Sequence, residues 1–197
     1  MEKKENTQEM QTEKKKSYLE TSVFKLTADR IGWLLILMVS GMISGGILSS
    51  FEDAIVLIPA LVSFVPMLTD TGGNAGSQSS SIVIQELAYG NIEPKDFLKV
   101  IWKEFRVSLI CGFILSLVNF FRILIIKGSE SIKLALTVSI AMMVTVVLAK
   151  ITGAMLSIGA KALKFNPALV SAPILTTIID AGALIVFFNV AKLILKF

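Results

Sequence analysis

Long apolar runs alternate with short charged segments along the chain. An α-helix needs about 20 residues to cross a bilayer, and five runs reach or exceed this length. They are Gly32–Ser50, Ile55–Tyr89, Val107–Ile126, Leu134–Ile158 and Ala168–Leu195. The second and fifth runs are longer than a bilayer requires, so we expect tilt, a break or an extension beyond the membrane. The pattern predicts an all-α integral membrane protein with five transmembrane helices over residues 31–197.

The middle of the second run is polar. Between Asp70 and Ser81 it holds an acid, three glycines, an amide pair and several serines. Such groups do not face lipid chains, because each unsatisfied polar group in hydrocarbon costs several kcal/mol. At about 1.5 Å per helical residue, the segment covers about half of a bilayer. We therefore interpret it as the wall of an aqueous pathway.

Residues 1–30 form a polar, lysine-rich tail before the first run. The tail lacks the apolar core and cleavage site of a signal peptide. We expect either a solvated arm or, over Tyr18–Arg30, a helix in the membrane interface, with lysines placed to contact anionic lipid headgroups.

The distribution of Lys and Arg predicts the orientation. In a five-helix topology, these residues are more frequent in the segments on the side of the N-terminus than in the opposite loops. The positive-inside rule then predicts a multi-pass protein of the cell (plasma) membrane. Its N-terminus is cytosolic and its C-terminus is extracellular or periplasmic.

The composition narrows the chemistry. The chain is 54% hydrophobic and only 17% charged, against about a quarter charged in soluble domains. Histidine is absent and there is one cysteine, so histidine metal sites, Ser-His triads and intrachain disulfides are excluded. Carboxylates, amides, hydroxyls and carbonyls remain, and these oxygen ligands suit hard cations such as Mg²⁺.

Asp180 is the first candidate metal ligand, because an ionisable residue inside a membrane span is expensive and usually functional. It lies near the midplane of the fifth run. Thr176 precedes it by one helical turn and Ala172 by two turns on the same face. The alternative is a protonated or lysine-paired aspartate that only packs.

Asp70 has a comparable depth in the second run. Gly72 and Gly73 permit close approach of a backbone or an ion, and Asn74 offers an amide oxygen to the water shell of a cation. The alternative is polar packing between helices. Lys150 lies in the fourth run and is expected either to neutralise an acid or to extend toward the inner surface.

A wide site lined by Asp180, Thr176 and Asn74 fits a hydrated ion, because Mg²⁺ gives up its water reluctantly. If the chain dimerises about an axis through the fifth run, two copies of Asp180 face one ion. Two carboxylates at such a short distance repel each other unless a cation lies between them.

Two segments resemble the transmembrane domain of the MgtE magnesium channels and their solute-carrier relatives. They read PMLTDTGGNAGSQSS in the second run and FNPALVSAPILTTIIDAGALIVFF in the fifth. DRIGWLLILMVSGMISGGI and WKEF are also similar to the family. The resemblance covers about Asp29–Lys196. It implies a homodimer of five-helix subunits with a pore at the two-fold axis. It also implies that Asp180 is the principal Mg²⁺ ligand, with Thr176 and Asn74 near the hydrated ion.

Three features depart from the family. Members commonly carry an amide where this chain has Ala172, and usually lack an acid where it has Asp70. Many members also bear cytosolic regulatory domains, including a CBS pair, before the membrane part, and the 197 residues do not include them.

We therefore expect a channel that conducts hydrated divalent cations, Mg²⁺ first, and that is not an enzyme. Mg²⁺ is its transported ion and pore ligand, membrane lipid surrounds it, and no nucleic acid is expected as a partner. One alternative is an exchanger in which Asp70 or Asp180 takes up H⁺ or Na⁺. A remote alternative is an intramembrane aspartyl protease, because residues 70–72 spell the DTG of aspartic proteases.

Overall fold

The computed structural model describes residues 18–196, apart from the side chains of residues 168–172. Within this range the chain is helical and has no strand, which confirms the all-α prediction. The α-helices are α2 (Val23–Ser49), α3 (Glu52–Leu57), α4 (Val65–Tyr89), α5 (Phe97–Lys127), α6 (Ile132–Ala162) and α7 (Pro167–Leu195). Short 3-10 helices are η2 (Tyr18–Glu20), η3 (Pro59–Phe64), η4 (Pro94–Asp96) and η5 (Ser129–Ser131).

Four helical segments among the described residues are long and apolar enough to cross a membrane. They are Val23–Ser49, Pro94–Lys127, Ser129–Ala162 and Pro173–Leu195. Sequence analysis predicted five spans, and four helices meet the criteria of length and composition. The difference is α4, which has 25 residues but carries the polar segment.

Prolines break the second apolar run, which is one of the three outcomes that its length led us to expect. After α3, the chain enters η3 at Pro59 and α4 with Pro66 in its first turn. Proline lacks a backbone N–H, and the first turn of a helix leaves that group unpaired in any case. The run is therefore divided between α3, η3 and one long helix.

The third helix begins earlier than its apolar run. Sequence hydropathy places the start at Val107, whereas α5 begins at Phe97. Glu93 and Asp96 form a reciprocal capping box around Pro94, which fixes the start of the helical segment. Glu104 consequently lies within α5, ahead of the apolar run.

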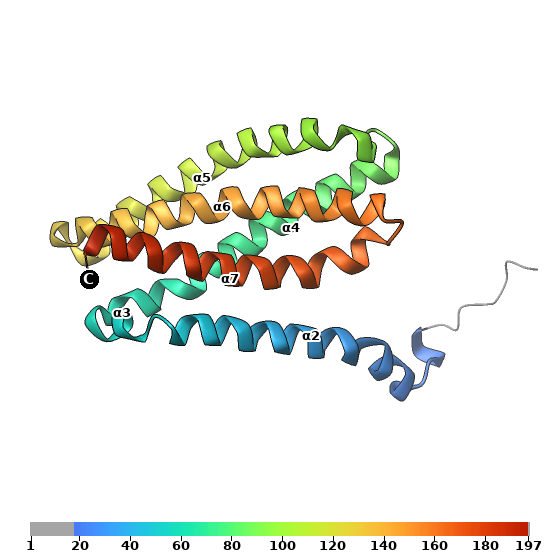
Figure 1. The fold of residues 1–197 in the computed structure, drawn as a ribbon, viewed down its shortest axis with the longest axis horizontal. Helices are drawn as coiled ribbons and strands as arrows, with labels where there is room; N and C mark the ends of the chain where they lie inside the picture. Colours follow the sequence, from blue (N-terminus) through green and yellow to red (C-terminus); the bar gives the residue numbers. More distant parts are fainter. Residues whose placement is uncertain (1–17, 197) are drawn as a thin grey trace, which may run out of the picture. The chain divides into compact units, whose positions relative to one another are not determined.

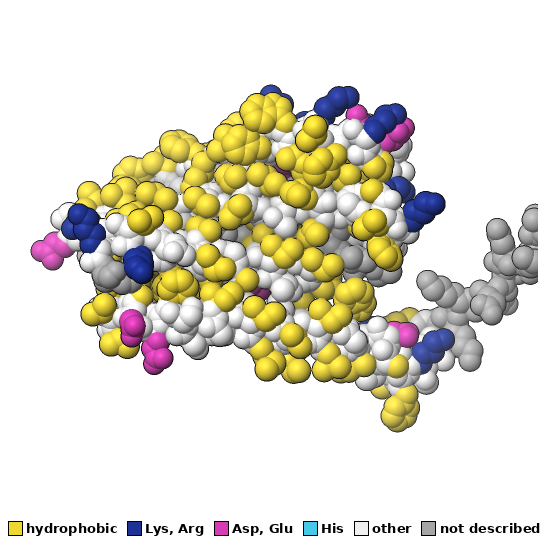
Figure 2. Space-filling view, in the orientation of Figure 1, with side chains coloured by type: hydrophobic (Ala, Val, Ile, Leu, Met, Phe, Trp, Pro, Cys, Tyr) yellow, Lys and Arg dark blue, Asp and Glu magenta, His cyan; other side chains and the backbone are white. Residues whose placement is uncertain are grey.

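The chain divides into two compact units, residues 1–36 and residues 37–197. In the first unit, Val23–Arg30 belong to α2, so the predicted tail ends within a helix; residues 1–17 of that tail lie outside the described part. In the second unit, α6 packs against α4, α5 and α7 (Figure 1). Figure 2 shows hydrophobic side chains over the middle of this bundle and most charged side chains toward its ends.

Close glycine contacts hold α4 against α6. A Cβ atom placed on Gly153 of α6 would lie 2.3 Å from the carbonyl oxygen of Gly76 on α4. One turn away, the hydroxyls of Ser80 and Ser157 are 2.9 Å apart. Small residues permit such close approach of helices. The contact fixes which face of α4 is turned into the bundle.

Candidate cation site and pathway wall

Helix α4 has one buried face and one exposed polar face. The buried residues recur every three or four positions and are Leu68, Gly72, Ala75, Gly76, Ser79, Ser80, Val83 and Leu87. The exposed face carries the polar residues Asp70, Asn74, Ser77, Gln78 and Ser81. The last four of these, with Ile82, line a depression of about 570 Å³. A polar face of this kind does not lie against lipid chains, because the bilayer core offers its groups no hydrogen-bond partners.

Asp70 and Asp180 come together although they are far apart in sequence. Helices α4 and α7 are in contact, and the two carboxylates are close enough to repel each other. Asp70 is exposed and Asp180 is half-buried. A cation between two such carboxylates lowers their electrostatic repulsion.

No group of three or more Asp, Glu, His or Cys side chains that could hold a metal ion occurs within residues 18–196. A divalent ion at Asp70 and Asp180 would therefore take its other contacts from neutral oxygens, water or a second copy of the chain. That donor set fits Mg²⁺, which usually keeps several waters and binds one or two carboxylates.

Of the predicted residues around Asp180, the structure describes the side chain of Thr176 but not that of Ala172. Thr176 is partly buried, and its hydroxyl donates to the carbonyl oxygen of Pro173 at 3.0 Å. A hydroxyl that donates its hydrogen keeps acceptor lone pairs. Thr177 donates to the same carbonyl at 2.9 Å. The side chain of Ala172 lies outside the described ones.

Neighbouring glycines on α4 have different surroundings. A Cβ atom on Gly72 would lie 2.7 Å from methyl groups of Thr145 and Ile179, so this glycine serves helix packing. A Cβ atom on Gly73 would meet nothing within 4 Å. Of the two, only Gly73 has open space beside it, next to Asn74 on the exposed face.

A buried polar network lies behind this face. The Ser79 hydroxyl lies 2.7 Å from Glu104 Oε2 and 2.8 Å from the backbone carbonyl oxygen of Lys150, so its single hydrogen is shared between these two acceptors. Sequence analysis missed Glu104 because it precedes the apolar run of α5. The signal that would have found it is the Glu93–Asp96 capping motif, which starts the helix before this residue.

Lys150 meets neither expectation. Its side chain is buried, with a residue exposure of 5%, so it does not extend to the inner surface. Within residues 18–196 the ion pairs are between Lys95 and Glu93 and between Lys99 and Asp96, so Lys150 neutralises no acid of the described chain.

Comparison with known proteins gives one consistent result. A family model for MgtE, described as a divalent cation transporter, matches residues 65–190. The chain is 34% identical to the magnesium transporter MgtE of Thermus thermophilus over 91% of its length, and 32% identical to that of Bacillus subtilis over 87%. The magnesium transporter MgtE of Enterococcus faecalis is 27% identical over 88%. These matches cover 39%, 38% and 38% of the three relatives, so the chain spans about two fifths of their length.

Proposed function

Because this chain belongs to the MgtE family of divalent cation transporters, we propose that it conducts hydrated Mg²⁺ through a pore between two copies of itself. One observation carries the proposal: the polar face of α4 is exposed, and it lies beside the Asp70–Asp180 pair. The naming of its relatives as magnesium transporters supports the choice of ion.

The dimer follows from what a single chain leaves uncovered. In one copy, the polar side chains on the outer face of α4 remain exposed; they are Asn74, Ser77, Gln78 and Ser81. A second copy facing the first encloses these groups around water, which the bilayer core does not supply. In this arrangement α4 is the fifth membrane helix of each subunit, although its hydropathy is low. The N-terminus lies in the cytosol and the C-terminus lies outside.

Two carboxylates and several neutral oxygens would act on the ion. Asp180 and Asp70 supply negative charge that attracts it. Thr176 and Asn74 hydrogen-bond its water shell, and the backbone near Gly73 and Ala172 offers further oxygens. Because Mg²⁺ holds its waters tightly, contacts through water let the ion enter and leave without dehydration.

Passive conduction needs no pump. Moving a doubly charged ion through 100 mV yields about 4.6 kcal/mol. An exchanger that couples Mg²⁺ to H⁺ or Na⁺ at Asp70 or Asp180 is the second candidate. A channel's flux follows voltage and the Mg²⁺ gradient alone, whereas an exchanger responds to an imposed pH or Na⁺ gradient. The protease alternative is not favoured, because the relatives are named transporters.

The test is Mg²⁺ uptake into proteoliposomes by Asp180→Asn, with Asp180→Ala as a second variant. Both are expected to abolish uptake while the dimer remains folded by size-exclusion chromatography. Asp53→Asn is the matched control, because Asp53 lies in α3 and lines neither the cavity nor the depression at the polar face of α4, and it should transport normally. Uptake at the wild-type rate by both Asp180 variants would contradict the assignment.

A further inference from the structure

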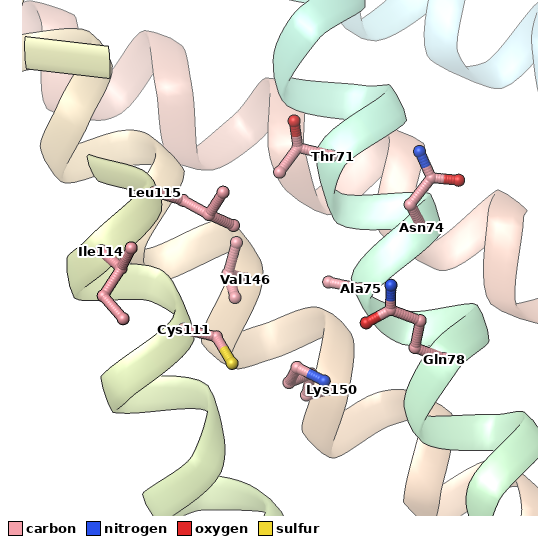
Figure 3. A pocket seen from close by; sticks show the side chains of 9 residues that line it. All are labelled: Thr71, Asn74, Ala75, Gln78, Cys111, Ile114, Leu115, Val146 and Lys150. Atoms are coloured by element: carbon pink, nitrogen blue, oxygen red, sulfur yellow. The ribbon is translucent and has the colours of Figure 1, made fainter. Parts of the chain in front are cut away.

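A cavity of about 430 Å³ lies between α4, α5 and α6 (Figure 3). Its walls differ in chemistry. Helix α4 contributes Thr71 and Gln78, whose side chains are polar, and α5 contributes Ile114 and Leu115, whose side chains are apolar. Lys150 of α6 completes the lining. The volume is within the range of about 300–1,000 Å³ that is typical of small-molecule sites.

The ammonium of Lys150 is the unusual feature of this cavity. Lys150 is only 5% exposed, and its Nζ atom has no hydrogen bond or ion pair within the described chain. Glu104, the acid of the buried network behind this face, accepts a hydrogen bond from Ser79. The Nζ atom is not among the fully enclosed polar atoms that lack a partner, so it faces the cavity. A charge held there, largely removed from water, is unfavourable unless it is paired. Its partner therefore comes from outside residues 18–196.

The surroundings of Lys150 select the class of partner. A metal cation would be repelled by the ammonium, and a neutral apolar molecule would leave the charge unpaired. A small inorganic anion would pair with the charge but leave the apolar wall at Ile114 and Leu115 without contacts. A molecule that joins an anionic group to an apolar chain satisfies both parts of the lining.

We propose that this cavity binds an amphipathic carboxylate. Its carboxylate pairs with the Lys150 ammonium, and its apolar chain lies against Ile114 and Leu115. Gln78 is placed to donate a hydrogen bond to the second carboxylate oxygen, since its amide is in the same lining. Asp70 and Asp180 do not line this cavity, but Asn74 and Gln78 line both it and the depression on the exposed face of α4. The carboxylate site therefore adjoins the proposed pathway, and its occupancy is measured without any transport of Mg²⁺.

Cys111 provides a direct reporter. It is the single cysteine of the sequence and lines the same cavity. In Figure 3 its sulfur is directed to the space beside Lys150. Iodoacetate and iodoacetamide both alkylate a thiolate, forming a carbon–sulfur bond and releasing iodide. Both rates are proportional to the fraction of Cys111 that is thiolate, so this fraction cancels in the ratio of the iodoacetate rate to the iodoacetamide rate. Only iodoacetate is negatively charged, so the ratio measures how strongly the cavity attracts an anion.

The experiment measures this ratio by mass spectrometry on the full chain in lipid nanodiscs. Lys150→Met should lower the ratio of iodoacetate to iodoacetamide rates by about tenfold, as expected for loss of a unit charge in a medium of low dielectric constant. Lys150→Arg keeps the charge and should keep the ratio. Lys161→Met is the matched control, because Lys161 is exposed on the last turn of α6. An equal ratio in Lys150→Met and wild type would overturn the proposal.

Protection of Cys111 identifies the ligand class. Decanoate should slow iodoacetamide alkylation of the wild type and of Lys161→Met, and should have no effect on Lys150→Met. Protection by decanol at equal concentration would show that the charge is not used, and protection by acetate would show that the apolar wall is not used. Either result would overturn the proposal. Because no ion gradient is involved, these outcomes are separate from those of the transport test.

Discussion

The contact between α4 and α6 gives the sharpest test of the packing that orients the polar face. In Gly153→Ala, the new Cβ atom would lie 2.3 Å from the carbonyl oxygen of Gly76 and 3.2 Å from the backbone nitrogen of Ser80. Favourable separations of heavy atoms are about 3.5–4.0 Å. The two helices must therefore separate by about 1 Å, which forfeits up to half of the local dispersion energy.

The magnitude follows from two opposing effects. Overpacking of this kind costs about 1–3 kcal/mol. Replacing glycine by alanine inside a helix returns about 0.5–1 kcal/mol. The expected net loss is up to about 2.5 kcal/mol, which corresponds to a fall in melting temperature of up to about 10 °C for a chain of this size.

The assay is the fraction of monodisperse protein left after stepwise heating in detergent. Gly159→Ala is the matched control, because it makes the same change on the same helix where a Cβ atom would meet nothing within 4 Å. That variant should melt at or slightly above the wild-type temperature. Equal melting temperatures for the two variants would refute the close α4–α6 contact.

Three further substitutions test the site and its support. Asp70→Asn should raise the half-saturating Mg²⁺ concentration for uptake by about tenfold, equivalent to 1.4 kcal/mol of lost attraction, and an unchanged value would remove Asp70 from the site. Ser77→Leu places a bulky apolar side chain on the exposed face of α4, so uptake should fall without a change in melting temperature; normal uptake would show that this face does not line the pathway. Glu104→Gln keeps an oxygen acceptor for Ser79, whereas Glu104→Leu does not, so the leucine variant should melt at the lower temperature, and the reverse order would contradict the network.

Hydropathy was sufficient to predict the all-α class and the positions of most helices, because apolar runs of bilayer length have few other structures available. It failed at the start of α5. Lys99 and Lys103 lie in the first turns of that helix, ahead of the apolar run that begins at Val107. The capping box at Glu93 and Asp96 is a local polar signal that an average of hydropathy does not register.

Sequence identified Asp70 and Asp180 as candidates separately, because each is an acid within an apolar run. Their proximity depends on the packing of α4 against α7, which no local pattern specifies. The same applies to Gly72 and Gly73: they are identical and adjacent in sequence, yet one packs against Thr145 and Ile179 and the other has open space. Which face of α4 is buried is determined by all of its contacts together.

The most direct test of a divalent-cation site at the Asp70–Asp180 pair is anomalous diffraction from crystals soaked with Mn²⁺. We expect a peak beside the Asp180 carboxylate, on the side of Asp70 and Asn74, that is lost when excess Mg²⁺ is added. Density that shows Asp180 turned toward lipid, or a saturated soak without a peak at this pair, would contradict the account.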